Sequence, residues 1–221
     1  MPKSYLDRKE AWAKRMAEKG IINSKERAEG RLPPGQHTVK KLPVLDLGIQ
    51  PKIEESDWIL QIGGEVENEL NLNWESLMEF DYLEEISDFH CVTTWSKYDC
   101  KWGGFRMLDV LEKARPHSNA GHVLFISYDG YTTNVSIEAV YSKHALLATK
   151  LDGEPLSKEN GGPVRVIFPH LYAWKSAKFV KEIQFTDELQ SGYWEKRGYS
   201  HSADPWKEER FIDKEVPGWR E

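Results

Sequence analysis

The sequence predicts an α+β domain built on mixed β-sheets with short helices. Short apolar runs of strand length alternate with turn signals, few helical patterns are long, and polar residues with chemical potential lie on the turns. The chain has 221 residues, of which 39% are hydrophobic and 30% charged, which suits one large globular domain. We expect that domain over residues 31–221, preceded by a helical extension over residues 1–30.

The first half of the chain supplies the elements in this order. Residues 4–19 are expected to form a charged helix, because Tyr5, Trp12 and Met16 can share one side of it. Paired prolines exclude a helix at residues 31–37. A strand is expected at residues 58–62, and Asn73 is expected to cap a short helix over residues 74–80.

The second half continues the alternation of short elements. We expect a helix at residues 107–114, buried strands at 123–128 and 164–168, a hairpin turn at 129–130 leading into a strand at 131–135, a tight turn at 152–153, and a half-exposed strand at 179–185. Ser136 is expected to cap another short helix. From residue 190 onward aromatic and charged residues follow no period, which predicts an irregular tail wrapped over the domain.

Composition and missing motifs exclude several classes of protein. The net charge of -6 argues against general nucleic-acid binding, which needs a basic face. Two cysteines cannot form a disulfide framework, and no apolar run approaches the roughly 18 residues of a membrane span. The N-terminus lacks the apolar region of a secretory signal and a twin-arginine pair, so we expect a cytoplasmic protein. Dinucleotide, P-loop and zinc-protease motifs do not occur.

Three segments contain the residues suited to chemistry. They read His-Cys-Val-Thr-Thr-Trp-Ser over residues 90–96, Asn-Gly-Gly-Pro-Val-Arg over residues 160–165, and Trp-Lys-Ser-Ala-Lys over residues 174–178. A cysteine thiolate is a soft metal ligand, and a single protein ligand leaves positions open for other groups. Cations and backbone donors, as in the two later segments, suit a bound anionic group.

In these segments the chain resembles the catalytic domain of the sulfite oxidase family, from about Arg31 to Trp206. It is most similar to the single-domain members and to the catalytic subunit of bacterial methionine-sulfoxide reductases, whose ligand segment also reads Cys-Val-x-x-Trp-Ser. The resemblance implies a sulfite-oxidase-like fold and a molybdopterin cofactor that carries molybdenum, or tungsten as a variant. It also implies oxygen-atom transfer to or from a small substrate while the metal cycles between two oxidation states.

The same resemblance assigns roles to residues of this chain. Cys91 corresponds to the molybdenum ligand, and Thr93 and Tyr172 are expected beside the metal as catalytic residues. Family positions that contact the cofactor correspond to Ser127, Asn160, Arg165, Ser176, Ala177 and Lys178. Further cofactor contacts are expected, by location, from Gln36, His37, His90 and His170.

Two departures from the family concern the substrate. Eukaryotic-type sulfite oxidases place arginines just after the ligand cysteine, whereas here no arginine occurs between Cys91 and Arg106, which argues against sulfite. Thr93 stands where the reductases carry a carboxylate, which argues against their substrate as well. Sulfur-containing compounds remain candidates. We expect no haem in this chain, so electrons would pass to a separate partner such as a cytochrome or another soluble carrier.

Two other classes of protein remain open from the residues alone. One is a hydrolase with Cys91 as nucleophile and His117 or His122 as its base. The other is a non-catalytic zinc module formed by His90, Cys91, Cys100 and a later histidine. A molybdenum centre bound by sulfur is coloured, whereas the sites of these two alternatives are not.

Overall fold

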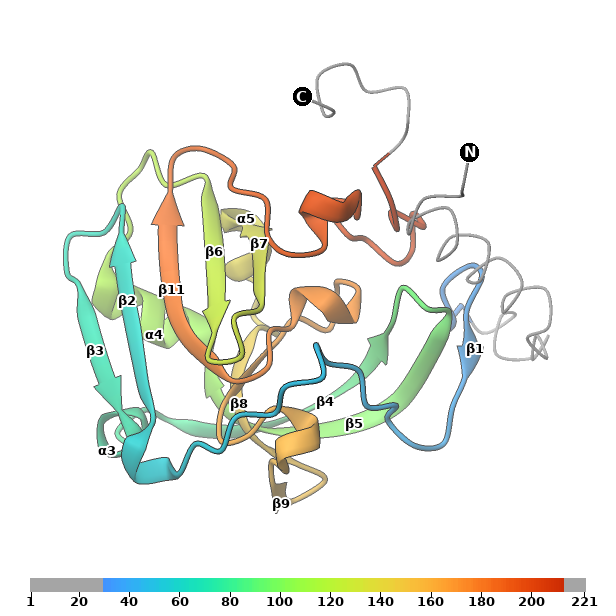
Figure 1. Cartoon of the computed structure of the whole chain (residues 1–221), viewed down its shortest axis with the longest axis horizontal. Helices are drawn as coiled ribbons and strands as arrows, with labels where there is room; N and C mark the ends of the chain where they lie inside the picture. Colours follow the sequence, from blue (N-terminus) through green and yellow to red (C-terminus); the bar gives the residue numbers. More distant parts are fainter. Residues whose placement is uncertain (1–29, 213–221) are drawn as a thin grey trace.

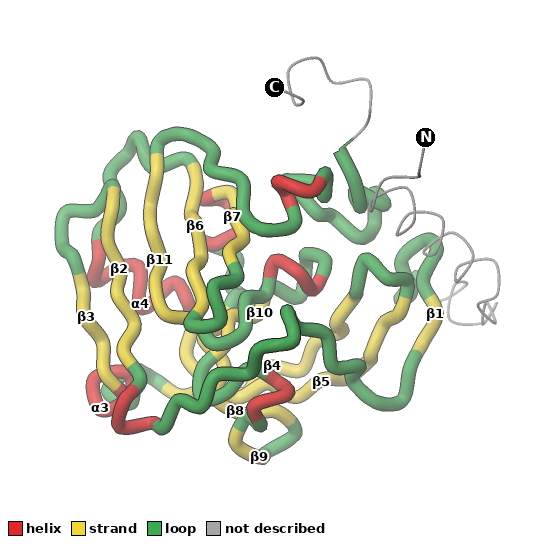
Figure 2. The backbone as a smooth tube through the Cα atoms, in the orientation of Figure 1, coloured by secondary structure: helices red, strands yellow, loops and turns green. Residues whose placement is uncertain are grey.

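The computed structural model describes residues 30–212 and divides them between two β-sheets (Figure 1). The expected helix at residues 4–19 lies outside the described residues. Within residues 30–212 no helix has the length and apolar character needed to cross a membrane. Helices are few and short, and loops make up much of the chain (Figure 2).

One sheet has six strands in the order β1-β5-β8-β10, with β4 paired to β5 and β9 paired to β8. Only the β1–β5 pairing is parallel among these strands. Their bounds are β1 His37–Thr38, β4 Tyr82–His90, β5 Trp95–Arg106, β8 Leu146–Leu151, β9 Glu154–Pro155 and β10 Arg165–Ile167.

The second sheet has five strands in the order β3-β2-β11-β6-β7, in which β2 and β11 are parallel and the other neighbours antiparallel. Both sheets are therefore mixed, which confirms the α+β expectation. The strands are β2 Ile59–Gly64, β3 Leu70–Asn73, β6 His122–Ser127, β7 Thr132–Ser136 and β11 Val180–Thr186.

Short helices connect the strands. The α-helices are α3 Trp74–Leu77, α4 Met107–Ala114 and α5 Ile137–Val140, and the 3-10 helices are η1 Glu55–Asp57, η2 Lys158–Asn160, η3 Ala173–Lys175 and η4 Glu195–Arg197. The helix at residues 107–114 has the predicted bounds and buries four apolar side chains along one face. Asn73 and Ser136 each accept a backbone N–H at the start of their helices, so both predicted caps are confirmed.

Two expectations differ from the structure in detail. Helix α3 ends at Leu77 rather than at residue 80, because the chain turns there and enters β4 at Tyr82. The strand at β6 alternates between buried and half-buried residues instead of being buried throughout. An alternating pattern is what a strand shows when only one face of its sheet lies against the core.

The core consists of two clusters of buried side chains. The larger cluster joins the five-stranded sheet to α4 and contains Trp58, Phe125 and Phe168. The smaller cluster surrounds Cys91 and Trp102. The chain beyond residue 187 contributes Tyr199 and other aromatic side chains to this second cluster, so the tail is part of the region around Cys91.

Candidate functional site

Cys91 lies in a tight loop between the two longest strands. β4 ends at His90 and β5 begins at Trp95. The N–H of Thr94 donates to the Cys91 carbonyl at 3.0 Å, and the N–H of Cys91 donates to the Trp95 carbonyl at 2.9 Å. Thr94 has a φ of 76°, which is strained for a β-branched residue. The hairpin therefore fixes the backbone that carries the thiol.

Two other parts of the chain hold this loop from outside. Gln36 Nε2 donates to the Cys91 carbonyl at 3.1 Å, and the N–H of His37 donates to the Thr94 carbonyl at 2.8 Å. From the tail, Arg210 Nη1 donates to the Val92 carbonyl at 2.7 Å. The peptide groups around Cys91 are thus bonded to both the β1 segment and the tail.

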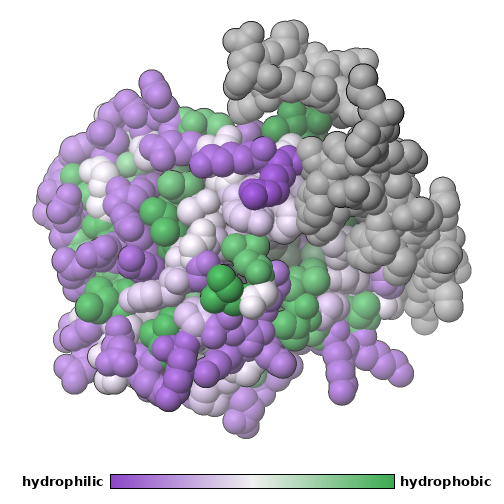
Figure 3. Space-filling view, viewed as in Figure 1, coloured by the Kyte–Doolittle hydropathy of each residue, from purple (hydrophilic) through white to green (hydrophobic). Residues whose placement is uncertain are grey.

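The thiol of Cys91 lines a pocket whose empty space, solvent at its mouth included, is about 940 Å³. Besides the Cys91 loop, its walls come from residues 42–47, the β6–β7 turn, residues 160–165, residues 173–178 and the tail. Residues 42–47 belong to the segment that crosses from β1 to β2 (Figure 1). Apolar residues gather near the middle of the face that is seen in this view (Figure 3).

Arg165 provides a buried cation in this pocket. Its Nη1 donates to the Asn160 carbonyl and its Nη2 to the Ser176 carbonyl, both at 3.0 Å. Its guanidinium also lies 5.5 Å from the ring of Phe89. Burial lowers the pKa of Arg165 to about 10, so the group stays charged at neutral pH. Its Nε is buried without a hydrogen-bond partner among the described residues, as expected where an acceptor is to be bound.

Lys178 is a second cation in the pocket, and it is half-buried. Its Nζ donates to the Glu159 carbonyl at 2.5 Å. Burial, followed by repulsion from Arg165, lowers the pKa of Lys178 to about 8, although Asp46 and Asp129 oppose this shift. An anion bound beside this ammonium would stabilise its charged form and raise its pKa again.

Aromatic side chains form the other part of the pocket wall. Trp174 packs edge-on against Tyr199 with ring centroids 5.2 Å apart, and Trp194 lies 4.9 Å from the same tyrosine. Trp95 and Tyr131 complete this wall. None of these aromatic residues was predicted as a site residue, although Trp95 and Trp174 lie within the segments that contain the predicted ones. The other signal in the sequence is the unusual number of tryptophans, nine in 221 residues.

Six of the predicted site residues line the pocket together: Cys91, Thr93, Asn160, Arg165, Ser176 and Lys178. The Cys91 Sγ lies 3.2 Å from Thr93 Oγ1. Ser176 accepts the Phe168 N–H through its hydroxyl at 2.9 Å, and its carbonyl serves Arg165. The roles given to these residues stay predictions, but their convergence on one pocket gives those roles a common location.

Four further predicted residues surround the Cys91 loop without lining the pocket. Gln36 and His37 make the bonds described above. His90 Nδ1 lies 2.8 Å from Ser96 Oγ, and burial lowers the pKa of His90 to about 4, so its ring is neutral at pH 7. Tyr172 is fully buried and stacks on Trp174 at 5.4 Å, and burial raises its pKa to about 12.

The remaining three predicted residues are not among those that line the pocket. Ala177 is buried, and its carbonyl accepts the N–H of Val166. Ser127 ends β6, where its backbone bonds to Tyr131. His170 is half-buried with its ring edge-on to Phe168. The cofactor contacts predicted for these three residues stay predictions.

Lys175, unlike Lys178 in the same 174–178 segment, does not line the pocket. Its side chain is fully buried and pairs with Glu195 at 2.5 Å, and it also donates to the Asn134 carbonyl at 2.7 Å. Glu195 accepts the indole N–H of Trp174 as well, at 3.2 Å. This ion pair therefore joins η3, β7 and the tail behind the aromatic wall instead of contributing a cation to the pocket.

Replacing Lys178 by methionine is expected to raise the free energy of unfolding of the cofactor-free protein at pH 7. Because the pKa of Lys178 is about 8 in the folded protein, the folded state binds this proton less tightly than the unfolded chain. The destabilisation by the charged Lys178 side chain is fully present below pH 8 and is lost as pH rises toward the ordinary lysine pKa of about 10.4. With the discount for a half-buried group we expect a gain of roughly 1 kcal/mol, measured by urea unfolding at pH 7.

The control for this experiment is Lys181→Met, since Lys181 is exposed on β11. Its effect is expected to stay within about 0.5 kcal/mol. At pH 10.5 the advantage of Lys178→Met is expected to vanish. A gain of the same size at both pH values would show that a contact of the methionine side chain, rather than the removal of a buried charge, causes it.

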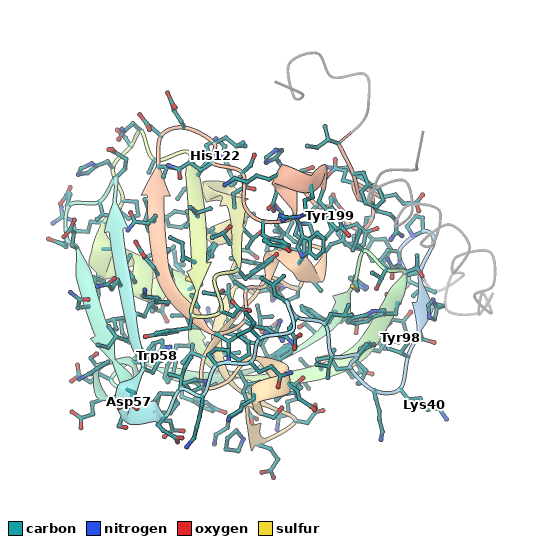
Figure 4. All side chains as sticks on the ribbon, in the orientation of Figure 1. Lys40, Asp57, Trp58, Tyr98, His122 and Tyr199 are labelled. Atoms are coloured by element: carbon teal, nitrogen blue, oxygen red, sulfur yellow. The ribbon has the colours of Figure 1, made fainter. Side chains whose placement is uncertain are left out.

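The structure gives no support to the two alternative classes. Within residues 30–212 no group of three or more His, Cys, Asp or Glu side chains is placed to hold a metal ion. His117 lies 3.4 Å from Glu65, and His122 lies at the upper end of β6 (Figure 4). Neither histidine lines the pocket that contains Cys91.

A thiol on a rigid loop, in one pocket with a buried arginine whose Nε has no partner among residues 30–212, suits a protein that binds an anionic cofactor. The fold of two mixed sheets agrees with the family resemblance of the sequence. The profile of the oxidoreductase molybdopterin binding domain matches residues 47–194, which is more than half of the chain. The chain belongs to this family.

Relatives with known sequences agree with that assignment. The chain is 43% identical over 184 residues to the uncharacterized oxidoreductase YuiH of Bacillus subtilis, covering 83% of this chain and 93% of that protein. It is 31% identical over 157 residues to the protein-methionine-sulfoxide reductase catalytic subunit MsrP of Campylobacter jejuni. That match covers 63% of this chain and 52% of MsrP, so the chain spans about half the length of this relative.

A solved structure shows the same fold. The sulfane dehydrogenase SoxCD from Paracoccus pantotrophus matches with a TM-score of 0.58 and 19% identity, over 63% of this chain and 40% of that one. At this identity the likeness concerns the fold alone.

Proposed function

We propose that this protein is a molybdenum enzyme of the sulfite oxidase type that transfers an oxygen atom to or from a small substrate, with Cys91 as the protein ligand of the metal. The observation that carries this proposal is that the Cys91 thiol shares one pocket with Arg165 and Lys178. When bound, the cofactor supplies two-electron redox chemistry. The chain supplies the ligand, the orientation and the shape of the pocket.

The cations of the pocket suit the anionic end of the cofactor. Arg165 is preorganised by the carbonyls of Asn160 and Ser176, so little conformational entropy is lost when it binds an anion. Lys178 regains charge stabilisation in the same event. These residues, with polar groups of Asn160 and Ser176, would hold the pterin and its phosphate, and Cys91 would bind the metal.

The surroundings of Cys91 suit a small uncharged substrate better than an oxyanion. Thr93 is the polar side chain beside the sulfur, at 3.2 Å. Trp95 and Trp174 form the neighbouring wall, and both cations of the pocket are assigned in this proposal to the cofactor. The name of the relative MsrP, a methionine-sulfoxide reductase, makes sulfoxides and other sulfur-containing compounds the first substrates to screen.

A separate electron carrier, such as a cytochrome or another soluble carrier, completes the proposal, because substrate turnover by an oxidoreductase requires an electron donor or acceptor.

We propose a cytoplasmic location for the enzyme. Cys91 and Cys100 form no disulfide, and reduced cysteines are the ordinary state in the cytoplasm. Fractionation of cells that carry a tagged chain would test this location. Recovery with the periplasmic or membrane fraction would contradict it.

The decisive measurement is the metal content of protein purified from a host that makes molybdopterin. Elemental mass spectrometry for molybdenum, tungsten and zinc should find close to one molybdenum or tungsten atom per chain. Oxidation of the released pterin to a fluorescent product gives an independent count of the cofactor. Zinc alone, or no metal after growth with molybdate, would contradict the proposed function.

A further inference from the structure

We infer that Arg210, in the C-terminal tail, is a positioning residue that fixes the Cys91 loop and its electrostatic surroundings. The inference rests on the proposed function of Cys91 as metal ligand. Arg210 lies beyond residues 47–194, the part of the chain that the family profile covers. It reaches the site through the backbone of the ligand loop, and it is not among the residues that line the pocket.

The contacts of Arg210 join three separate parts of the chain. Nη1 donates to the Val92 carbonyl at 2.7 Å, one residue after the predicted ligand. Nη2 donates to the Pro34 carbonyl at 3.2 Å, in the segment just before Gln36. The guanidinium carbon lies 5.0 Å from the centre of the Tyr172 ring. The β1 segment, the ligand loop and Tyr172 therefore meet at one cation.

The environment makes this arrangement rigid. The Arg210 side chain is 11% exposed, and its carboxylate neighbour Glu208 lies at 3.6 Å, too far for a short ion pair. The tail itself is anchored nearby, since the N–H of Tyr172 donates to the Ala203 carbonyl at 2.8 Å. A planar guanidinium with several donors can serve two carbonyls and an aromatic face at once, which a lysine cannot.

Two consequences follow for the ligand loop. First, Arg210 restrains Val92, which limits the orientations available to the Cys91 side chain. Second, a fixed positive charge beside the loop would favour the state of the metal centre that carries more electrons. Groups that orient metal ligands in this way commonly change affinity or activity by about 10- to 100-fold when they are removed.

The test compares holoenzyme variants Arg210→Met and Arg210→Lys with Arg197→Met as matched control. Arg197 lies in the same tail and makes the same kinds of contact, with a carbonyl at 2.7 Å and a ring at 3.6 Å, but both belong to Tyr193. Each protein is analysed for molybdenum and pterin content, for the Mo(V) electron paramagnetic resonance spectrum, and for the midpoint potential of the metal.

We expect wild-type metal content in the variants, with altered g-values and a lower midpoint potential in Arg210→Met. The lower potential corresponds to a reduced-to-oxidised ratio about tenfold smaller at a fixed applied potential, the lower end of the range for such groups. Arg210→Lys should recover part of the potential, because it keeps the charge, and Arg197→Met should match the wild type.

A wild-type spectrum and potential in loaded Arg210→Met would overturn the inference, and so would equal changes in the Arg197 variant. If Arg210→Met does not fold or load, the Arg210→Lys protein decides: an altered spectrum supports the inference and an unaltered one overturns it. Wild-type protein that contains no molybdenum or tungsten would instead overturn the proposed function, and the inference with it.

Discussion

Replacing Cys91 by serine is expected to abolish the visible absorbance of the metal centre and to lower turnover at least about 100-fold. A serine hydroxyl is a harder ligand than a thiolate and stays protonated at neutral pH, so it cannot substitute for the soft sulfur donor. The loop should keep its shape, because its bonds to Gln36, His37 and Arg210 involve backbone carbonyls. Absorbance spectra and metal analysis of the purified variant check this result.

Cys100 supplies the matched control. It is buried, and burial raises its pKa to about 12, so it remains a thiol that fills space in the second core cluster. Cys100→Ala is expected to cost about 1 kcal/mol of stability through lost packing and to leave the colour unchanged. If Cys91→Ser keeps its colour and metal, Cys91 is not the ligand. If only Cys100→Ala loses both, Cys100 is the ligand instead.

The parts of the fold that could be predicted are those set by local sequence. Helix α4 follows from four apolar residues at helical spacing, and the helix caps follow from single side chains that bond within three residues. The hairpin of β6 and β7 follows from Asp129 and Gly130 between two strand patterns. These signals need no knowledge of distant parts of the chain.

The long hairpin of β4 and β5, which carries Cys91, was not predicted. Gly103 and Gly104 both lie within β5, although glycine in the interior of a strand weakens it. A Cβ on Gly104 would lie 2.1 Å from the Leu147 carbonyl oxygen of β8, so the glycine permits close approach of another strand. Such a pairing joins residues more than 40 positions apart, and no local pattern reveals it.

The site residues likewise fall into those that local sequence motifs predict and those that depend on distant contacts. The family motifs located Cys91, Arg165 and Lys178, which the pocket brings together. The aromatic wall and the contacts of Arg210 depend on how the tail returns to the domain, and nothing near these residues in the sequence encodes that path. The basic residues Arg165, Lys175 and Lys178 illustrate the limit, because Arg165 and Lys178 line the pocket while Lys175 forms a buried ion pair with Glu195.

Replacing Lys175 alone by methionine is expected to lower the free energy of unfolding by about 3–5 kcal/mol, the usual cost of leaving one charge of a buried pair without its partner. Both side chains of the Lys175–Glu195 pair are inaccessible to solvent. Glu195 would keep donors from Thr133 and Trp174 but lose its counter-ion. Urea unfolding of wild type and variant at pH 7 measures the loss.

The double variant Lys175→Met with Glu195→Gln removes both charges and should be less destabilised than the sum of the single variants, by more than about 1 kcal/mol. Additive effects would mean that the two charges are not coupled, and that the aromatic wall around Trp174 is held by packing alone.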